Sequence, residues 1–338
     1  MTFIHELADW PNLTGRSDQI IDRLASVRYR QGKLNGRMES LGQKFQERAR
    51  VQILADEVVS SSAVDHITLE VADVRASIAK KLGKDLRHWV PEPHVEAPVI
   101  VLLDAISNYL APLTEDRLLG WHHSLTLADP AATPTGGTGQ DMAEFFEWIE
   151  ADISADPVLK AGLAHLWFMS VHPFSTGNYR IAAAITSLAL ARAEGCNRQC
   201  VSLSGQIRKS RNRYRDMVQE AKAGTLDVTE SLIWFLDCLD KAITASEVIL
   251  DKLHQKEQAE VQLSAMGLND RQRRMLDLLR SGIENELKSG LWASMTNSSS
   301  DTAGRDIKKL VALGLLKKNQ GRGRSTSYSL VEKPRRLG

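Results

Sequence analysis

The stretch at residues 171–180 carries the residue types that a phosphate-handling site needs. His172 follows an apolar helical pattern, and Gly177-Asn178 forms a turn that leads into a second helical pattern. Backbone N–H groups at a helix start attract anions, and the helix dipole adds to that attraction. Arg180 is placed to reach a bound phosphate, and His172 is a candidate general base. Taken alone, a histidine before a proline more often packs or caps a helix, so the wider pattern decides.

The elements that must position this stretch are predicted to be helices. Apolar residues recur at helical spacing through most of the chain before residue 251. The segments with this pattern are 20–41, 51–59, 71–82, 99–110, 142–149, 158–171, 180–192, 204–224 and 229–250. Three serines at 60–62 are predicted to end the second segment, and a loop rich in Pro, Thr and Gly covers 125–139. The sequence therefore predicts a mainly all-α fold.

The C-terminal segment has a different pattern. Predicted helices at 269–282 and 299–313 enclose a short segment around residue 293. Two strand-like runs, 315–318 and 325–330, then flank a basic Gly-Arg-Gly-Arg turn. Helix, short helix, helix and hairpin follow one another in the order of a winged helix-turn-helix with a small β-hairpin.

The near-neutral charge of the chain conceals a division. The 338 residues include 43 Lys+Arg and 42 Asp+Glu, a formal net charge of +1. Residues 268–338 hold 15 Lys+Arg against 7 Asp+Glu, a net charge of +8, which leaves −7 for residues 1–267. The balance therefore excludes a uniformly basic protein, but it leaves room for a basic terminal domain that binds nucleic acid.

The basic residues of this segment fall on two elements that DNA-binding proteins use together. The candidate DNA-binding residues are Thr302, Arg305, Lys308 and Lys309 on the last helix, and Arg322 and Arg324 in the predicted wing. Helix residues would read base edges in the major groove while wing cations bind phosphates. The alternative is a small winged domain that contacts proteins through ordinary solvated lysines. A two-fold operator would in addition require a homodimer.

Cysteine usage and hydropathy indicate a cytoplasmic protein with no membrane partner. Cys196, Cys200 and Cys238 cannot form a disulfide framework, which favours a reducing compartment. No apolar run approaches the roughly 18 residues of a membrane span, and the first residues do not follow the pattern of a signal peptide.

The residues from His172 to Ala183 resemble the core motif of the Fic family, His-Pro-Phe-x-Asp/Glu-Gly-Asn-Gly-Arg-x-x-Arg. Further segments resemble one bacterial branch of that family, and the resemblance covers nearly the whole chain. These segments are 3–6, 9–11, 120–122, 164–168, 204–208, 234–236, 268–272 and 323–328. The resemblance implies three domains. They are a helical Fic-associated domain at 1–90, a Fic core at 91–255 and a winged helix-turn-helix at 265–331.

The resemblance also implies a reaction. Fic proteins usually move AMP from ATP to a hydroxyl of a target protein, which the sequence does not name here. By resemblance, His172 is the base on that hydroxyl, and an acidic residue of the motif holds Mg²⁺ on the phosphates. The nucleotide-binding positions carried over from the motif are Phe174, Gly177, Asn178, Tyr179 and Arg180.

Four departures from the motif put this reaction in doubt. Thr176 stands where the acidic metal ligand is expected, so Mg²⁺ binding is not expected. Tyr179 replaces the second glycine, which predicts a bulky side chain where the backbone should approach a phosphate. Ala183 replaces the second arginine, which removes a phosphate clamp. The segment between Trp121 and Asp141 is shorter than the family pattern and is predicted to lack the flap that docks the target.

The inhibitory motif of the family, Ser-x-x-x-Glu-Gly, is degenerate as well. Here it begins at Ser61, and its last two positions are Asp65 and His66, while the arginine that its Glu would pair with is Ala183. An inhibitor is unnecessary where there is no activity to inhibit. The combined changes predict a pseudoenzyme that binds DNA as a regulator. The alternatives are a working transferase that uses ATP or another nucleotide with His172 as base, and a plain nucleotide binder for which ATP is the candidate.

Overall fold

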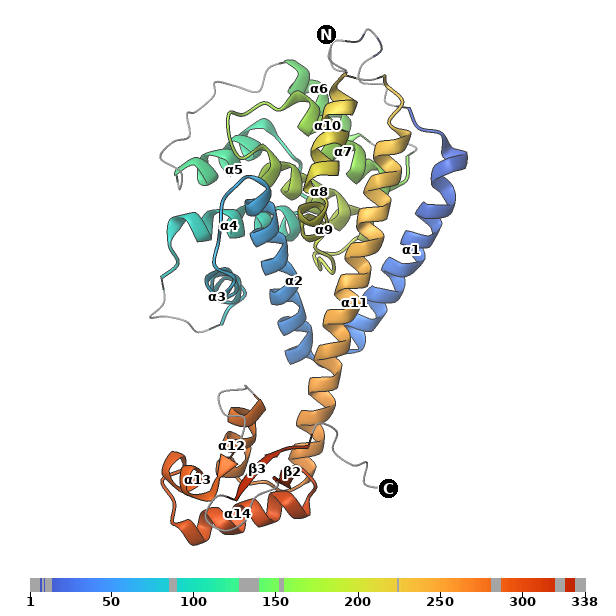
Figure 1. Cartoon of the computed structure of the whole chain (residues 1–338). Coiled ribbons are helices and arrows are strands. Elements are labelled where there is room, and N and C mark those ends of the chain that lie inside the picture. Colours follow the sequence, from blue (N-terminus) through green and yellow to red (C-terminus); the bar gives the residue numbers. More distant parts are fainter. Residues whose placement is uncertain are drawn as a thin grey trace. The chain divides into compact units, whose positions relative to one another are not determined.

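The computed structural model describes residues Leu7, Asp9, 14–84, 90–127, 140–151, 155–223, 225–280, 287–319 and 326–331. The chain divides into two compact units, Met1–His254 and Gln255–Gly338. Helices dominate both, as predicted, and the small sheet lies in the second (Figure 1). No helix in the described part of the chain is long and apolar enough to cross a membrane.

The described residues of the first unit are mainly helical. They are α1 (Ser17–Ser40), α2 (Gln43–Val64), α3 (Val71–Lys81), α4 (Pro93–Ser107), α5 (Glu115–Leu127), α6 (Gln140–Glu150), α7 (Pro157–Val171), α8 (Asn178–Glu194), α9 (Leu203–Lys209), α10 (Arg211–Ala223) and α11 (Thr229–Ala265), the last of which continues beyond this unit.

Several helix boundaries differ from the predicted ones, among them the start of α4 at Pro93 and the end of α11 at Ala265. The prediction that serines 60–62 end a helix is wrong, because α2 runs through them and buries all three. The buried Ser61 hydroxyl finds a hydrogen-bond partner inside the helix, because it donates to the Val58 carbonyl at 3.1 Å. The single helix predicted at 204–224 is two helices, α9 and α10, which meet at Ser210.

The central helix of the first unit is α8, whose residues are buried from Asn178 to Ala191. It packs mainly against α7 and α4, with α2 and α5 also in contact (Figure 1). The main hydrophobic core around it includes Leu34 of α1, Ile53 of α2 and Leu236 of α11. The N-terminal helices therefore share one core with the helices that carry the 171–180 stretch.

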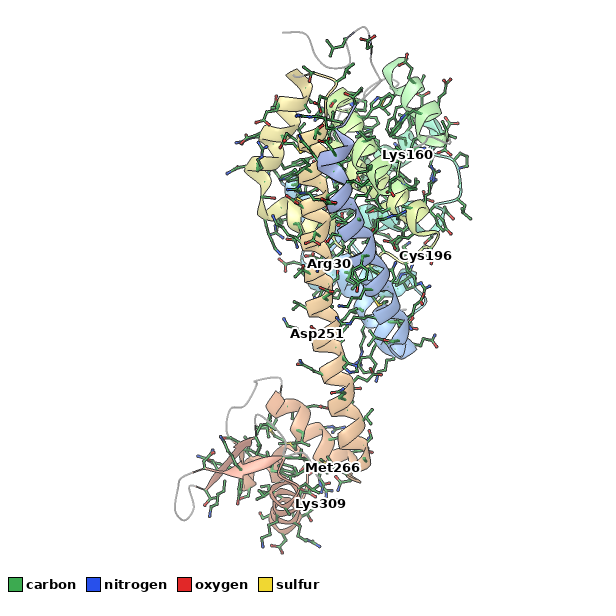
Figure 2. All side chains as sticks on the ribbon, turned by 90° about the vertical axis from the view of Figure 1, so that its right-hand side faces the viewer. Arg30, Lys160, Cys196, Asp251, Met266 and Lys309 are labelled. Carbon is green, nitrogen blue, oxygen red and sulfur yellow. The ribbon has the colours of Figure 1, made fainter. Side chains whose placement is uncertain are left out.

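A line of ion pairs joins α1 to α11, and the two helices run side by side (Figures 1 and 2). Arg30 makes two of these ion pairs, donating to Asp240 at 2.5 Å and to Glu247 at 2.8 Å. It also donates to the Thr244 hydroxyl at 2.9 Å. One guanidinium thus binds three partners on successive turns of α11, which sets the register of the two helices.

The second unit contains α12 (Asp270–Arg280), β1 (Leu287–Lys288), α13 (Ser289–Met295), α14 (Ser300–Ala312), β2 (Leu316–Lys318) and β3 (Ser327–Leu330). The strands form an antiparallel sheet in the order β1-β3-β2, with Leu316 opposite Leu330 and Leu287 opposite Tyr328. Leu276, Trp292 and Ile307 belong to its separate core. The strand β1 was not predicted, because two residues are too few to produce a strand pattern.

Packing between α7 and α11 leaves no room for a side chain at Gly162. A Cβ there would lie 2.9 Å from Cδ1 and 3.0 Å from Cγ of Phe235. We expect Gly162→Ala to lower the free energy of unfolding by about 1–3 kcal/mol, because the buried ring must move. A Cβ at Gly32 on α1 would have no atom within 4 Å. Gly32→Ala should therefore raise the free energy of unfolding by up to about 1 kcal/mol, because alanine has the higher helix propensity. Urea denaturation measures both, and equal effects of the two would contradict this packing.

Candidate functional site

The loop between α7 and α8 is shaped by two residues with left-handed backbone conformation. His172 ends α7 with a φ of 51°, and its N–H donates to the Phe168 carbonyl at 2.9 Å. Gly177 precedes α8 with a φ of 77°, a conformation that glycine adopts without strain. The two turns reverse the chain tightly, so that the imidazole and the start of α8 line the same cavity.

Asn178 holds the loop in place from the first position of α8. Its Oδ1 accepts from the Phe174 N–H at 3.1 Å, and its Nδ2 donates to the Phe174 carbonyl at 2.5 Å. The same Nδ2 lies 3.3 Å from Nδ1 of His172. The Phe174 ring is buried and stacks on the His122 ring, with centroids 4.0 Å apart. The geometry of the turn therefore depends on a side-chain amide that matches both backbone hydrogen-bonding groups of Phe174.

The hydrogen bond from Asn178 fixes the protonation pattern of His172. Because an amide nitrogen only donates, Nδ1 of the ring accepts, and the neutral imidazole carries its proton on Nε2. Loss of solvent around the ring and the positive charge of Lys222 both lower the pKa of His172. The imidazole is therefore neutral at pH 7 and is oriented by its neighbour.

Tyr179 does not occupy the position predicted for it. Its side chain turns into the core, where it is 2% exposed and its hydroxyl donates to Oγ of Ser204 at 3.1 Å. The ring contacts His165 and Tyr214 edge to face. The prediction that this side chain stands where a phosphate would approach is wrong, because position 179 lies on the inner face of α8.

Behind Tyr179 lies a buried carboxyl group on α2. The carboxylate oxygens of Glu57 accept from the backbone N–H of Ser204 at 3.0 Å and from its hydroxyl. Burial raises the pKa of Glu57 to about 7, although the hydrogen bonds from Ser204 oppose the shift. This contact ties α2 to the start of α9.

The degenerate inhibitory motif places its carboxylate directly on the start of α8. Oδ2 of Asp65 accepts from the backbone N–H of Arg180 at 3.2 Å and from its Nε at 3.0 Å. The Arg180 side chain is 7% exposed and that of Asp65 is 16% exposed, so solvent screens the pair little. Asp65 thus binds the first arginine of the motif, a partner that the sequence comparison with position 183 did not identify. The Ser61 hydroxyl donates to the Val58 carbonyl within α2, and Ser61 lines a small cavity together with Arg180 and Ala183.

A cavity of about 400 Å³ opens in front of this loop. Its walls come from the end of α2, the loop and start of α8, and one face of α10. The lining residues that could bind a ligand through charge or hydrogen bonds are Asp65, His172, Ser175, Thr176, Asn178, Arg180, Arg211, Arg215, Gln219 and Lys222. Four cationic side chains against one carboxylate give the cavity a positive charge, which fits a ligand that carries phosphate.

The cations of α10 were missed by sequence reasoning. Arg211, Arg215 and Lys222 repeat at helical spacing together with Tyr214 and Val218, which are buried. A cationic stripe beside an apolar stripe is the signal that could have located this wall. Only the packing of α10 against α7 brings that stripe to the cavity.

The residues of the cavity do not fit a divalent metal ion. The Thr176 hydroxyl, at the position of the expected ligand, is buried and has no hydrogen-bond partner among the described residues. The one carboxylate in the wall is bound by Arg180. Within the described part of the chain there is no group of three or more His, Cys, Asp or Glu that could hold a metal. Mg²⁺ prefers several oxygen ligands including carboxylates, and the described wall of this cavity offers no unpaired carboxylate. The predicted absence of a flap concerns residues of which 128–139 lie outside the described part.

The candidate DNA-binding residues of α14 lie opposite its buried face. Arg305, Lys308 and Lys309 are exposed, while Ala303, Ile307 and Leu310 are buried. Lys309 also donates to the carbonyl of Gly267 at 2.9 Å, close to Met266 in Figure 2.

Thr302 takes part in the cap of α14. Its N–H donates to Oγ of Ser299 at 3.2 Å. The neighbouring strand β2 adds two exposed cations, Lys317 and Lys318. Arg322 and Arg324 of the predicted wing lie outside the described residues.

The buried carboxyl of Glu57 predicts a pH dependence of stability. Its folded-state pKa of about 7 lies above its ordinary value of 4.5, so the folded protein keeps a proton that the unfolded chain releases. As the pH rises from about 5 to 7, this group should contribute a negative slope to the free energy of unfolding, of at most about 1.4 kcal/mol per pH unit, which opposes the positive slope from buried His165 with its pKa lowered to about 4. Glu57→Gln should lose this slope, whereas Glu70→Gln, at an exposed position, should keep it. An unchanged slope in Glu57→Gln would contradict the assignment.

Comparisons with known proteins agree with this architecture. Residues 3–84 match a domain of unknown function, DUF4172, and residues 112–190 match the Fic/DOC family. A comparison with curated proteins gives no match.

Among solved structures, a Fic family protein from Desulfovibrio desulfuricans G20 is similar over 94% of this chain and 97% of its own, with 18% identity and a TM-score of 0.54. Fic-1 from C. elegans is similar over 69% of this chain and 73% of its own, with 19% identity and a TM-score of 0.53. A Fic domain containing signaling protein from Bacteroides thetaiotaomicron VPI-5482 is similar over 67% of this chain and 98% of its own, with 17% identity and a TM-score of 0.50. At these identities the structures share the fold, and the sequence match supplies the domain. The chain is therefore a Fic family protein, with a Fic/DOC domain that follows a DUF4172 domain.

Proposed function

We propose that this Fic family protein is a DNA-binding regulator whose Fic cavity binds a nucleotide without efficient AMP transfer. ATP is the expected nucleotide, because phosphate-binding cations line the cavity beside the motif loop. The observation that carries the proposal is the position of Asp65, which occupies both the N–H and the guanidinium of Arg180. The three cysteines are free thiols, in keeping with a cytoplasmic location.

Loss of efficient transfer follows from the groups that remain. Transfer requires that charge developing on the phosphates be neutralised by groups already in place. Arg180 is neutralised by Asp65, Thr176 supplies no carboxylate, and Ala183 supplies no second guanidinium. In addition, a base at Nε2 of His172 needs a free lone pair there, and the hydrogen bond from Asn178 favours the opposite tautomer.

DNA binding is supported by the exposed cations of the second unit. Arg305 and Lys308 stand on the outer face of α14, and Lys317 and Lys318 on β2. The order of helices and strands supports a winged helix-turn-helix, in which α14 would enter the major groove. Asp306 holds this helix against α12 by accepting from Arg271 at 2.5 Å and from Gln272 at 2.7 Å. These contacts hold the inner face of α14 against α12, and the cationic outer face of α14 stays exposed and available to DNA.

Substitution of α14 cations tests the DNA-binding part. We expect the full chain to bind duplex DNA with an affinity that falls steeply with salt, because each phosphate contact contributes about 0.9 to the log–log slope. Arg305→Ala should weaken binding, and Lys308→Ala should weaken it and reduce the slope. Lys33→Ala, which removes an exposed lysine from α1, should change neither. Fluorescence anisotropy over a range of salt measures both quantities, and absence of binding at low salt would refute this part.

A working transferase is the second candidate. It is favoured by the position of His172 in the cavity wall and by the lowered pKa, which keeps the ring neutral at pH 7, as a general base must be.

Labelling with ATP separates the two candidates. Under our proposal, incubation with labelled ATP, Mg²⁺ or Mn²⁺ and lysate gives equal labelling of target proteins with wild type and with His172→Ala. The reason is that the phosphate charge is not neutralised for transfer. Labelling that disappears only in His172→Ala would establish the transferase instead. A thermal denaturation curve of His172→Ala, matching wild type, serves as the control for folding.

A further inference from the structure

Among the described residues that line the cavity, Lys222 is the one cation that makes neither a hydrogen bond nor an ion pair within the protein. Arg180 is paired with Asp65, Arg211 donates to the carbonyl of Val64 at 2.7 Å, and Arg215 has Asp216 3.8 Å away. Lys222, in the last turn of α10, has no hydrogen bond or ion pair with any described residue, and desolvation alone lowers the pKa of its ammonium group. It is therefore a partly buried charge without compensation.

Lys222 lines the same cavity as the motif loop. Its positive charge is one of the causes that lower the pKa of His172, so the two side chains are electrostatic neighbours. Both line the same cavity as the loop from Ser175 to Arg180. The ammonium group and the imidazole therefore line one cavity and interact electrostatically.

An uncompensated, partly buried ammonium group costs folding free energy unless something binds it. Ligand binding explains why such a costly group lies in the wall. The expected metal ligand is a buried hydroxyl at Thr176, and Asp65 already occupies the anion-binding groups of Arg180. Any phosphate that enters the cavity thus finds its free positive charge on α10 and not on α8.

We propose that Lys222 is the principal phosphate-binding residue of this cavity and that it holds an anionic phosphate group of a nucleotide next to His172. The inference rests on the proposed nucleotide binding by the Fic cavity, and it assigns that binding to a residue outside the Fic motif. Because an ammonium group binds as a point charge with rotatable donors, it requires neither a fixed fork geometry nor a metal-bridged phosphate. Nucleotide binding is accordingly independent of divalent metal.

Calorimetry of the full chain with ATP in EDTA tests this inference. Wild type should bind ATP under these conditions. Lys222→Gln should bind it about 10-fold to 100-fold more weakly, the loss expected for one charge-assisted hydrogen bond. Lys222→Arg should retain most of the affinity. Lys209→Gln, at an exposed lysine that does not line the cavity, should bind as wild type does.

A second measurement reports on the site without relying on affinity. In the unliganded protein, the pKa of His172 followed by NMR should rise in Lys222→Gln, because a neighbouring positive charge is removed. It should stay as in wild type in Lys209→Gln.

The outcomes separate this inference from the proposed function. Equal ATP binding by wild type and Lys222→Gln would overturn the role of Lys222 and leave nucleotide binding intact. No ATP binding by wild type, in EDTA or with Mg²⁺, would overturn both. Binding by wild type only when Mg²⁺ is present would also overturn the inference, since a metal would then supply the charge assigned to Lys222.

Discussion

The contact between Asp65 and Arg180 is the constraint on which the site depends. It joins the end of α2 to the start of α8, the most deeply buried helix of the first unit. Two turns earlier on α2, Glu57 holds Ser204 at the start of α9. With α2 anchored at both points, its last residues form one wall of the cavity. A carboxylate from the protein itself satisfies the helix terminus that would otherwise attract an anion.

Occupation of that terminus changes how the rest of the cavity can work. A carboxylate paired with a buried guanidinium is screened little by solvent, so a competing phosphate must displace it or bind elsewhere. The motif residues that survive, His172, Asn178 and Arg180, are held by internal hydrogen bonds. The remaining free charge lies on α10. Degeneration of the motif therefore redistributes positive charge within the cavity and does not abolish it.

The second unit shows a comparable division within a single helix. Ala303, Ile307 and Leu310 of α14 pack inward, and Asp306 is bound by α12. Arg305 and Lys308 are left in solvent. Periodicity and charge predicted this arrangement because both faces follow from spacing along one helix. The cap at Ser299 is equally local, since this serine accepts from an N–H only three residues away.

Local chemistry is what the sequence determined by itself. Helical periodicity, the Gly177 turn into α8 and the basic face of α14 depend on residues a few positions apart. Tertiary structure alone decided that Tyr179 points into the core, that Asp65 binds Arg180, and that Lys222 lines the same cavity as His172. Asp65 and Arg180 are 115 residues apart in the chain, and no spacing rule connects them. Which charges pair across such distances depends on which helices pack together. The alanine at position 183 therefore shows that the expected partner of Asp65 is missing, but it does not show that Asp65 pairs with Arg180 instead.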